Sequence, residues 1–508
     1  MSLDRSLDPS LAQGVAEQLH LSSFPDSPIA QATPLHDAIT PDAPQLELRD
    51  AAGVGIGTGA GGRFELVDRP QYFVFLFVNP TSGGSKAGEI TQLGVETFRF
   101  HAPYDMMAYV YDITSGDPGN KPGFKRLKTV VDGVPADQIV RVVVAGGDGT
   151  VMWCLSELEE HGIDVMRVAI GVVPYGTGND FARALAWSRI SNCALFDASF
   201  ALFKALVHTW IESRVVPYDI WEVEVSVQDD GCFKKIDSKT RQKKTLTQRD
   251  DASRPVVSQK FPMANYFSTG IESRIGLGFD RHRARSPFAN KVVYFTEGLK
   301  KAFKKTPRIT DVISNLSEVS GESGPSQESP LARSEPASTS SERSVFSLST
   351  SSGGPKLVGK PASLIAINIP SFAGGLDIWR SSKGRPGLRQ AAFNQDEILK
   401  SPQAVGDGKI EWMTFDSSVA IGAEKVISGH GRRVYQGSGP FKLTFKDRLP
   451  GGEGRFYMQV DGEFFQLCKP KEALLRHHKT IQVLMADQKV LARRIKEAKH
   501  GVHRRTAP

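Results

Sequence analysis

The chain has 508 residues, of which 40% are hydrophobic and 23% are charged, and its formal net charge is +7. This composition is ordinary for a globular protein of roughly two to four domains, so it excludes collagen-like, coiled-coil and fully disordered chains. The surplus of positive charge favours anionic partners, namely nucleic acid, anionic lipid or phosphate-bearing ligands, without choosing among them.

Four cysteines, Cys154, Cys193, Cys232 and Cys468, lie far apart in the chain and form no CxxC pair. This spacing excludes a zinc ribbon, a zinc finger and a disulfide scaffold, and free thiols fit a reducing compartment. No apolar run reaches the ~18 residues needed to span a bilayer, and the N-terminus has no apolar signal segment. We therefore expect a cytoplasmic protein.

Residues 1–70 are rich in Asp, Pro and Ser and are predicted to form a flexible extension. Gly57, Gly59 and Gly62 satisfy the GxGxxG pattern of dinucleotide-binding proteins. However, no convincing strand precedes these glycines, and a strand rather than a helix follows them. The dinucleotide interpretation therefore fails, because that motif needs a strand before it and a helix after it.

From residue 71 onward, a strand, a glycine-rich turn and a helix recur three times. The strands are predicted at 72–78, 139–145 and 168–173, with a further strand at 106–111. This alternation predicts an α/β nucleotide-binding domain with a parallel sheet over residues 71–215.

After about residue 215 the apolar pattern shifts toward a period of two, as in 219–227. Many short strands predict a β-rich, sandwich-like accessory domain over residues 216–466. Two polar insertions, near 228–256 and 314–357, interrupt the pattern. Neither can bury enough apolar surface to offset its ordering entropy, so both are expected to be disordered.

The C-terminal segment, residues 467–508, is basic, and its apolar residues fall roughly at helical spacing, which predicts a helix or tail. Several cations lie close together near its end: Lys489, Arg493, Arg494, Lys496 and Lys499. They could contact an anionic leaflet, or they could form the solvated face of a packed surface helix. The sequence leaves both interpretations open.

Three glycine turns, at 79–84, 146–150 and 174–180, follow the predicted parallel strands. Ligands bind at the carboxyl ends of such strands, and glycine lets backbone N–H groups approach a phosphate closely. Asp148 could not touch a phosphate unaided, but it would be suitable with a divalent cation between them. The plain alternative is three ordinary turns with glycine at positive φ. No GxxxxGK[ST] motif is present, which excludes a P-loop enzyme.

The segments FVNPTSGG (77–84), VAGGDGTV (144–151) and VPYGTGNDFARA (173–184) resemble the catalytic domain of diacylglycerol kinases. GGDGT is shared with other lipid kinases and with NAD kinases, whereas ceramide and sphingosine kinases depart from the GTGNDFAR stretch. Segments 265–283, 368–379, 407–411 and 459–463 are similar to the accessory domain of the same family. The resemblance covers about 72–466, apart from the two insertions.

The resemblance implies transfer of the γ-phosphoryl group of ATP, with Mg²⁺, to the hydroxyl of a membrane diacylglycerol. It also implies a peripheral protein on an anionic lipid surface, with no nucleic-acid partner. Asp461 would be the general base, Glu463 would orient or polarise the site from the same strand face, and Asp148 would complete the catalytic carboxylates. From the residues alone, Asp461-Gly462 could equally be a hairpin turn.

By the same matching, the nucleotide-binding candidates lie in the three turns and in one loop after the second strand. They are Asn79, Ser82, Gly83, Thr114, Gly146, Gly147, Gly149, Thr150, Gly176, Thr177, Gly178 and Asn179. Thr114 could instead cap its loop. Lys86 and Arg183 could meet phosphates or be solvated helix charges, and Asp180 needs no catalytic role at a helix start.

Asp407 is implied as a ligand of the structural Mg²⁺ site known in bacterial relatives. The family usually has two aspartates before Gly408, whereas this chain has Gly406-Asp407, so one ligand is missing. The cysteine count also excludes the Cys- and His-rich modules that bind diacylglycerol in many eukaryotic members. Three alternative functions remain: a kinase for another lipid, an NAD kinase, and a catalytically silent lipid-binding scaffold.

Overall fold

The computed structural model describes most of the chain from residue 70 to residue 505. The described residues are 70–83, 86–92, 94–101, 103–176, 178–190, 195, 200–237, 239–248, 250–251, 253–282, 307–320, 341–348, 354–389, 395–424, 426–449 and 454–505. The predicted extension with its GxGxxG pattern, Thr177 and Cys193 lie outside the described residues.

A mostly parallel sheet forms the first part of the described chain. Its strands are β1 (Tyr72–Val78), β2 (Thr97–Phe100), β3 (Met106–Asp112), β4 (Val140–Gly146) and β5 (Val168–Pro174). The order β3-β1-β4-β5 is parallel throughout, and β2 lies antiparallel at the edge. Nearly every residue of β1 is buried, as expected for a sheet covered on both faces. The predicted α/β architecture with a parallel sheet is confirmed.

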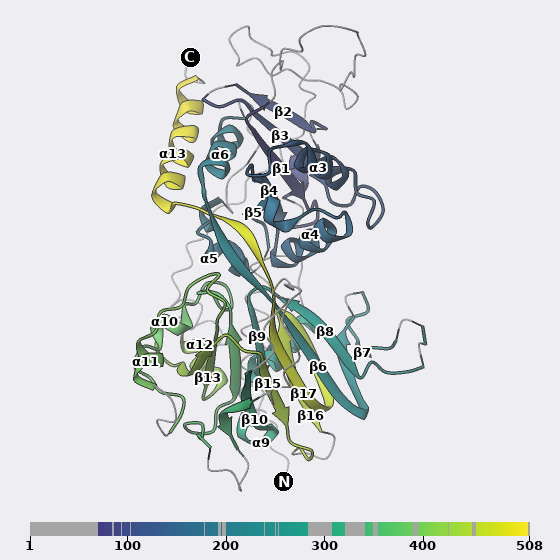
Figure 1. Ribbon diagram of the computed structural model, residues 1–508, viewed down its shortest axis with the longest axis vertical. Coiled ribbons are helices and arrows are strands. Elements are labelled where there is room, and N and C mark those ends of the chain that lie inside the picture. Colours follow the sequence, from purple (N-terminus) through teal and green to yellow (C-terminus); the bar gives the residue numbers. More distant parts are fainter. Residues whose placement is uncertain are drawn as a thin grey trace, which may run out of the picture. The chain divides into compact units, whose positions relative to one another are not determined.

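Helices cover both faces of this sheet. Figure 1 shows α3 and α4 on one face and α6 on the other. The helical segments are α2 (Gly88–Gln92), α3 (Pro122–Gly133), α4 (Asp148–Glu160), η1 (Val165–Arg167), α5 (Asp180–Ala184), η2 (Ser188–Ile190) and α6 (Ala201–Glu212). Because α4 and α5 begin directly after β4 and β5, their N-termini meet at the carboxyl edge of the sheet.

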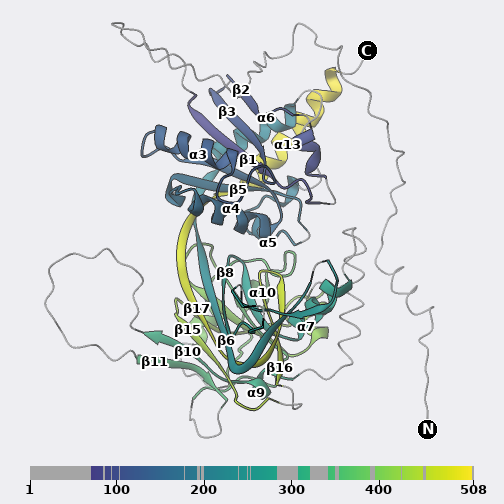
Figure 2. The same cartoon turned by 90° about the vertical axis from the view of Figure 1, so that its right-hand side faces the viewer.

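Two long strands, β6 (Arg214–Ile236) and β17 (Glu463–Met485), pair antiparallel and lie side by side in Figure 2. The end of β17 also runs parallel to β5, with Gln482 opposite Ala169. The prediction of a helix or tail from residue 467 is therefore wrong as far as Met485. Register shifts within the β6–β17 pairing change the phase of the apolar pattern, which then imitates helical spacing.

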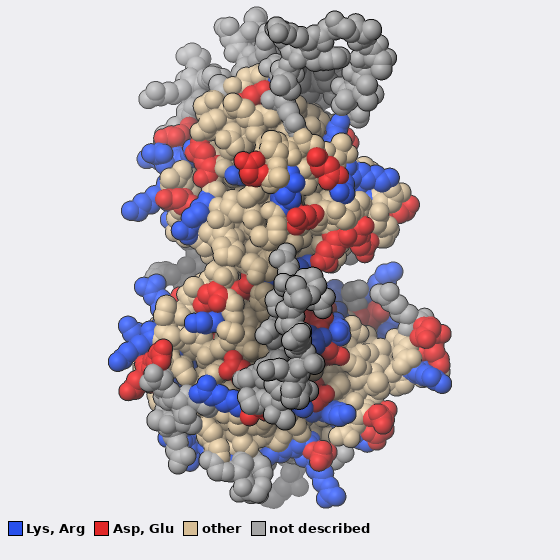
Figure 3. Space-filling model, viewed as in Figure 1, with Lys and Arg blue, Asp and Glu red and all other residues tan. Residues whose placement is uncertain are grey.

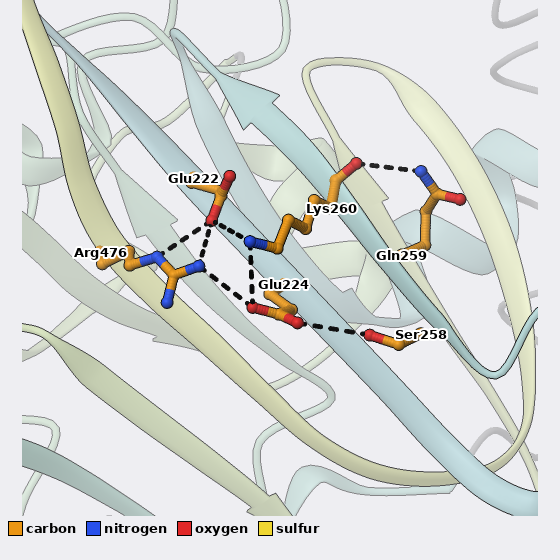
Figure 4. A network of polar contacts seen from close by, with 6 residues as sticks. All are labelled: Glu222, Glu224, Ser258, Gln259, Lys260 and Arg476. Atoms are coloured by element: carbon orange, nitrogen blue, oxygen red, sulfur yellow. Dashed lines mark hydrogen bonds and ion pairs between the residues drawn. The ribbon is translucent and has the colours of Figure 1, made fainter.

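An ion-pair network crosses β6, β17 and the neighbouring strand β8 (Ser258–Met263), as Figure 4 shows. Arg476 Nε donates to Glu222 Oε1 at 3.0 Å, and Arg476 Nη2 reaches Glu224 Oε2 at 3.1 Å. Lys260 Nζ lies 3.5 Å from Glu222 Oε1. Since one guanidinium and one ammonium share two carboxylates, the network connects the three strands.

The remaining strands form the β-rich part of the chain. They are β7 (Lys243–Thr245), β9 (Tyr266–Gly270), β10 (Ile313–Ser320), β11 (Ser341–Ser347), β12 (Ser363–Ile367), β13 (Ile410–Phe415), β14 (Arg432–Gly437), β15 (Phe441–Phe445) and β16 (Arg455–Val460). Five of them lie in the antiparallel order β16-β9-β12-β13-β14. The helices here are α7 (Ile271–His282), α9 (Ile309–Val312), α10 (Ile378–Ser381), α11 (Gln395–Lys400) and α12 (Ser418–Ala423). The last helix of the chain is α13 (Gln488–Arg505).

The two segments predicted to be disordered contain strands. Residues 228–256 hold the end of β6 and all of β7, and they bury Phe233 and Ile236. The segment 314–357 begins in β10 and ends after β11, and residues 321–340 lie outside the described residues. The prediction is wrong for the described parts, because they pair with neighbouring strands and because the end of β6 and β11 bury apolar side chains.

The described cysteines are free thiols. Cys154 is buried in α4, and burial raises its pKa above the usual range. Cys232 and Cys468, distant in sequence, lie opposite each other in the β6–β17 pairing. The expectation of reduced cysteines is therefore consistent with the fold, although two of them are brought together by it.

Glu272, in the first turn of α7, is a buried carboxyl group within the β-rich part. Neither of its oxygens has a hydrogen-bond partner among the described residues, although the hydroxyls of Ser268 and Ser363 lie near. Burial raises its pKa to about 8. The folded protein therefore holds Glu272 protonated at neutral pH.

We predict that Glu272→Gln increases stability relative to the unsubstituted protein as the pH rises. Between the ordinary pKa of 4.5 and about 8, the unfolded chain releases a proton that the folded chain keeps. Stability should therefore fall by up to about 1.4 kcal/mol per pH unit in this window, and the amide removes that loss. Urea unfolding at a series of pH values measures it. Glu89→Gln, at an exposed position in α2, is the control, and parallel pH profiles for Glu272→Gln and the parent protein would contradict the assignment.

Candidate active site

Two of the glycine turns pack backbone against backbone at the carboxyl edge of the sheet. A Cβ atom on Gly176 would lie 2.6 Å from the Cα of Gly147, and one on Gly146 would lie 2.5 Å from Thr150 Oγ1. Of the described glycines in the three turns, only Gly83 has a positive φ, +66°. Close approach, rather than backbone conformation, therefore requires glycine in the second and third turns.

Asn79 fixes the first turn to the second. Its Nδ2 donates to Thr150 Oγ1 at 3.2 Å, and its Oδ1 accepts from Thr81 Oγ1 at 2.8 Å. The amide of Ser82 donates to the Asn79 carbonyl at 3.1 Å. Gly149, at the start of α4, is exposed and has no atom within 4 Å of its Cβ position. The first two turns thus form one surface of loops and helix N-terminus.

The third turn contains a buried acceptor without a partner. Asn179 adopts the left-handed conformation at φ 53° before α5, and its Nδ2 donates to the Gly176 carbonyl at 2.7 Å. Its Oδ1 is buried and makes no hydrogen bond within the described part of the chain. Gly178 lies beside the carboxylates of Asp148 and Asp180. A ligand that brings a donor to this turn would satisfy Asn179.

Thr114 is not joined to the other candidates by any contact in the described residues. It is exposed, and its N–H and Oγ1 both donate to Asp112 Oδ1 at 2.7 Å. This is the loop-capping arrangement that the sequence left open. Lys86 is also exposed, and Arg183 Nε donates to the Gly178 carbonyl at 3.3 Å.

Asp148 links the second turn to the third. Its Oδ2 accepts from the Asp180 amide at 3.0 Å, and its Oδ1 accepts from the Phe181 amide at 3.3 Å, so it lies at the N-terminus of α5. Burial raises the pKa of Asp148 to about 7, the negative charges of Asp180 and Asp461 add to the shift, and the two amides oppose it. The carboxyl groups of Asp148, Asp180 and Asp461 therefore concentrate negative charge in this part of the protein.

Asp180 connects the third turn to the β-rich part. Its carboxyl group is 2% exposed, and its Oδ1 accepts from Ser371 Oγ at 2.6 Å and from the amides of Gly374 and Gly375 at 3.0 and 3.1 Å. The Tyr266 hydroxyl donates to its Oδ2 at 3.2 Å. The sequence interpretation as a simple helix-start carboxylate missed this role. The sequence did offer a signal: Asp180 lies in a segment that resembles the catalytic domain, and Ser371 lies in a segment that resembles the accessory domain.

Asp461 and Gly462 form the two-residue hairpin loop between β16 and β17, with φ values of 47° and 83°. Asp461 Oδ2 accepts from the amide of Ala264 at 2.6 Å, and its Oδ1 accepts from the amides of Asn265 and Tyr266 at 2.9 Å each. Burial raises its pKa to about 6, against these hydrogen bonds, and Asp180 adds to the rise. The hairpin interpretation is correct for the backbone, while the carboxylate accepts from the backbone at the start of β9.

Glu463 does not lie where the sequence predicted it. The chain reverses direction at residues 461–462, so Glu463 opens β17 instead of continuing the strand of Asp461. Its exposed carboxylate pairs with Lys235 Nζ at 3.0 Å. The expectation of a shared strand face is therefore wrong.

The carboxylates at the predicted metal position near Asp407 make hydrogen bonds to backbone amides and to a histidine. Asp407 is exposed and accepts from the amide of Lys409 at 3.1 Å. The carboxylate beside it, Asp219, accepts from Gly408 N at 2.7 Å and from His477 Nε2 at 2.9 Å. A side chain at Gly406 would begin 2.2 Å from the Pro217 carbonyl oxygen, which excludes a second aspartate there without a backbone shift.

No group of three potential metal-ligating side chains occurs among the described residues. Gly406 has no room for a second carboxylate and the Asp219 oxygens are taken up by hydrogen bonds, so the residues around Asp407 do not fit the two-aspartate Mg²⁺ site that the sequence resemblance implies. Hydrogen bonds from His477, the Gly408 amide and Thr480 hold the pKa of Asp219 low, although burial alone would raise it.

Two family domains match this chain, and the contacts of Asp180 join residues of one match to residues of the other. The diacylglycerol kinase catalytic domain matches residues 73–200, and the diacylglycerol kinase accessory domain matches residues 262–464. The chain belongs to the diacylglycerol kinase family. The catalytic match contains the three glycine turns, and the accessory match contains Tyr266, Ser371 and Asp461.

Similar proteins carry the same family name. The chain is 26% identical to "Probable diacylglycerol kinase 3" of Caenorhabditis elegans, over 77% of this chain and 41% of that protein. It is 27% identical to "Diacylglycerol kinase theta" of Mus musculus, over 77% of this chain and 32% of that protein. It is 24% identical to "Diacylglycerol kinase 1" of Oryza sativa subsp. japonica, over 80% of this chain and 77% of that protein. The chain thus spans less than half the length of the first two relatives.

We predict that Asp180→Asn destabilises the folded protein by about 1–3 kcal/mol, because an amide nitrogen would face the N–H and O–H donors that now meet a carboxylate. Chemical denaturation measures the loss. Asp132→Asn is the control, since the Asp132 side chain is 58% exposed and pairs only with Lys128 in its helix. Equal stability of the two variants would mean that the Asp180 contacts contribute nothing to folding.

Proposed function

We propose that this protein is an ATP-dependent diacylglycerol kinase, which transfers the γ-phosphoryl group of ATP to a diacylglycerol hydroxyl and releases phosphatidic acid. The supporting observation is the carboxylate cluster of Asp148, Asp180 and Asp461. It lies where the glycine turns of the catalytic match meet the accessory match. A phosphoryl acceptor and a triphosphate must both reach one place, and this is the place where phosphate-binding turns adjoin a carboxyl base.

The glycine turns would hold the nucleotide. Backbone N–H groups at the start of α4, where Gly149 is exposed, suit phosphate oxygens. The unpartnered Asn179 Oδ1 could accept from a nucleotide donor. Asp148 would hold Mg²⁺ together with the phosphates, because Mg²⁺ sites commonly use one or two carboxylates and substrate oxygens. The bound cation would neutralise charge that develops on the phosphates.

Asp461 would accept the proton of the attacking hydroxyl. Its Oδ2 accepts one hydrogen bond, from Ala264, and a carboxylate oxygen has room for two. A pKa of about 6 keeps the group largely ionised at neutral pH while leaving it basic enough for proton transfer. The amides at residues 264–266 would fix its orientation.

The proposed organisation is a catalytic domain over 71–215, a sandwich-like accessory domain over 216–466, and peripheral association with an anionic membrane. In the described part of the chain, no helix combines the length and apolar character needed to cross a membrane. Helix α13 packs on α6, where Arg494 Nη2 pairs with Glu212 at 2.5 Å, and it leaves Lys489 and Lys496 exposed. Figure 3 shows acidic and basic side chains interspersed on one face.

The direct test is a phosphorylation assay with labelled ATP and Mg²⁺ on a panel of diacylglycerol, ceramide, sphingosine and NAD. We expect label in phosphatidic acid. Label in another lipid or in NAD would replace the proposed substrate, and no labelled product would favour the lipid-binding scaffold. Omission of Mg²⁺ is the internal control for nucleotide-dependent transfer.

We predict that Asp461→Asn lowers kcat by about 10²–10⁴-fold, the range typical of a lost general base. Asparagine tolerates the left-handed turn conformation, but its amide nitrogen would face a backbone N–H that now meets a carboxylate oxygen. Thermal unfolding of the variant therefore separates a loss of kcat from a loss of folded protein. Asp447→Asn, at an exposed position of the accessory match, is the matched control. In the parent protein kcat/KM should rise with pH through about 6, where Asp461 loses its proton. Turnover retained by Asp461→Asn would remove this residue from the mechanism.

A further inference from the structure

Exposed apolar side chains are concentrated in one short segment of the accessory match. Four large hydrophobic residues are exposed in the described part of the chain, and three of them are Val419, Val426 and Ile427, at 68, 81 and 67%. We call these three residues the apolar loop. The fourth, Met166, is 47% exposed and belongs to η1 in the catalytic match. Such a concentration marks an interaction surface, whereas an isolated exposed residue does not.

The apolar loop has a defined backbone. Ile427 N donates to the Ala423 carbonyl at 2.7 Å, which continues the helical spacing of α12. Val419 lies in α12 itself, whereas Val426 and Ile427 lie in the turn that follows the helix end at Ala423. Val426 N donates to the same carbonyl at 2.9 Å. The two hydrogen bonds thus fix the turn that carries Val426 and Ile427 to the end of the helix that carries Val419.

A buried carboxylate holds the backbone next to the apolar loop in place. Glu424, 5% exposed, accepts from the amide of Gly429 at 2.8 Å and from the amide of His430 at 2.7 Å. It also accepts from Ser381 Oγ at 2.5 Å, which ties the loop to the end of α10. Arg385 Nη1 donates to the Gly429 carbonyl. Because these bonds keep the backbone in place, the apolar side chains cannot turn inward without breaking them.

Cations flank the loop at its attachment to α10. Arg380 and Lys383 are exposed on either side of Ser381, the residue that Glu424 contacts. No acidic residue occurs between 378 and 389. Apolar side chains next to exposed cations are the combination that binds the interface of an anionic bilayer.

An apolar cluster connects this segment to the candidate active site. Ile421 of α12 belongs to the same buried cluster as Trp379, Phe372 and Tyr266. Tyr266 in turn donates its hydroxyl to Asp180. A surface that contacts lipid at α12 is therefore joined through continuous packing to the carboxylates that would receive the glycerol hydroxyl.

We propose that the apolar loop inserts among the lipid headgroups of an anionic bilayer, with Arg380 and Lys383 against the lipid phosphates. The occupant of this surface is thus a phospholipid membrane. The proposal rests on the proposed function in one respect, since a kinase of diacylglycerol must meet its substrate in a membrane. It concerns binding alone, so its test needs neither ATP nor diacylglycerol.

The test is co-sedimentation of the full chain with vesicles of phosphatidylcholine, with and without phosphatidylserine. Val426→Ser/Ile427→Ser removes apolar surface without adding charge, and we expect about tenfold or more weaker binding to both vesicles. Met166→Ser is the matched control and should bind as the parent does. Arg380→Gln/Lys383→Gln should weaken binding only where phosphatidylserine is present, and this effect should fade at high salt.

Three results would overturn the proposal. Unchanged vesicle binding by Val426→Ser/Ile427→Ser is the first. The second is loss of binding by Lys489→Gln/Lys496→Gln in α13 alone, which would place the membrane contact on that helix. The third is conversion of a dimeric parent to a monomer by the serine variant with unchanged vesicle binding, which would make the loop an interface between copies.

A separate measurement distinguishes membrane binding from catalysis. On a short-chain diacylglycerol that is monomeric in water, Val426→Ser/Ile427→Ser should keep the kcat of the parent, and its thermal unfolding should be unchanged because both side chains are exposed. A parent that binds vesicles through the loop but phosphorylates no lipid would refute the proposed function and leave this inference standing. A parent that phosphorylates the soluble lipid but needs no loop residue for vesicle binding would do the reverse.

Discussion

The hydrogen bonds around the buried carboxylate of Asp180 are the interaction on which the rest of the site depends. Removing a carboxylate from water is costly unless donors replace the water, and here a serine hydroxyl, a tyrosine hydroxyl and two glycine amides do so. All of these donors come from the accessory match, whereas Asp180 opens a helix of the catalytic match. The same residue therefore satisfies its own charge and connects the nucleotide turns to the segment that would position the lipid.

Bringing three carboxylates together is unfavourable, and the pKa values of two of them are raised as a result. Burial raises the pKa of Asp148 to about 7 and that of Asp461 to about 6, and the neighbouring charges increase both shifts. Backbone amides offset part of this cost at each group, because an amide in fixed position donates without losing side-chain entropy. A bound cation would neutralise the remaining excess of negative charge, which is the role given to Mg²⁺ in the proposed function.

The sequence predicts the parallel sheet and its glycine turns well, because a continuous apolar run such as 72–78 and a following turn carry their own local signals. The sequence predicts less of the structure where pairing between distant segments decides which element forms. Strand β17 resembles a helix in its spacing because bulges shift its phase, and only its partner β6 defines it as a strand. Glu463 is misplaced for a related reason, since the positive φ values of residues 461–462 turn the chain through a hairpin. Asp180 is underestimated because its hydrogen-bond donors lie between 86 and 195 residues away in the sequence.

Under the proposed function, one substrate is dissolved in water and the other in a bilayer, and the accessory match would bring the two together. Its buried cluster, from Ile421 to Tyr266, offers a continuous apolar structure between an exposed segment and the carboxylates. Such packing transmits position rigidly, because protein interiors are close-packed and resist compression. A membrane contact at α12 would therefore set the distance and angle at which the glycine turns face the bilayer. The geometry of phosphoryl transfer would then be fixed by how the accessory part docks, not by the nucleotide turns alone.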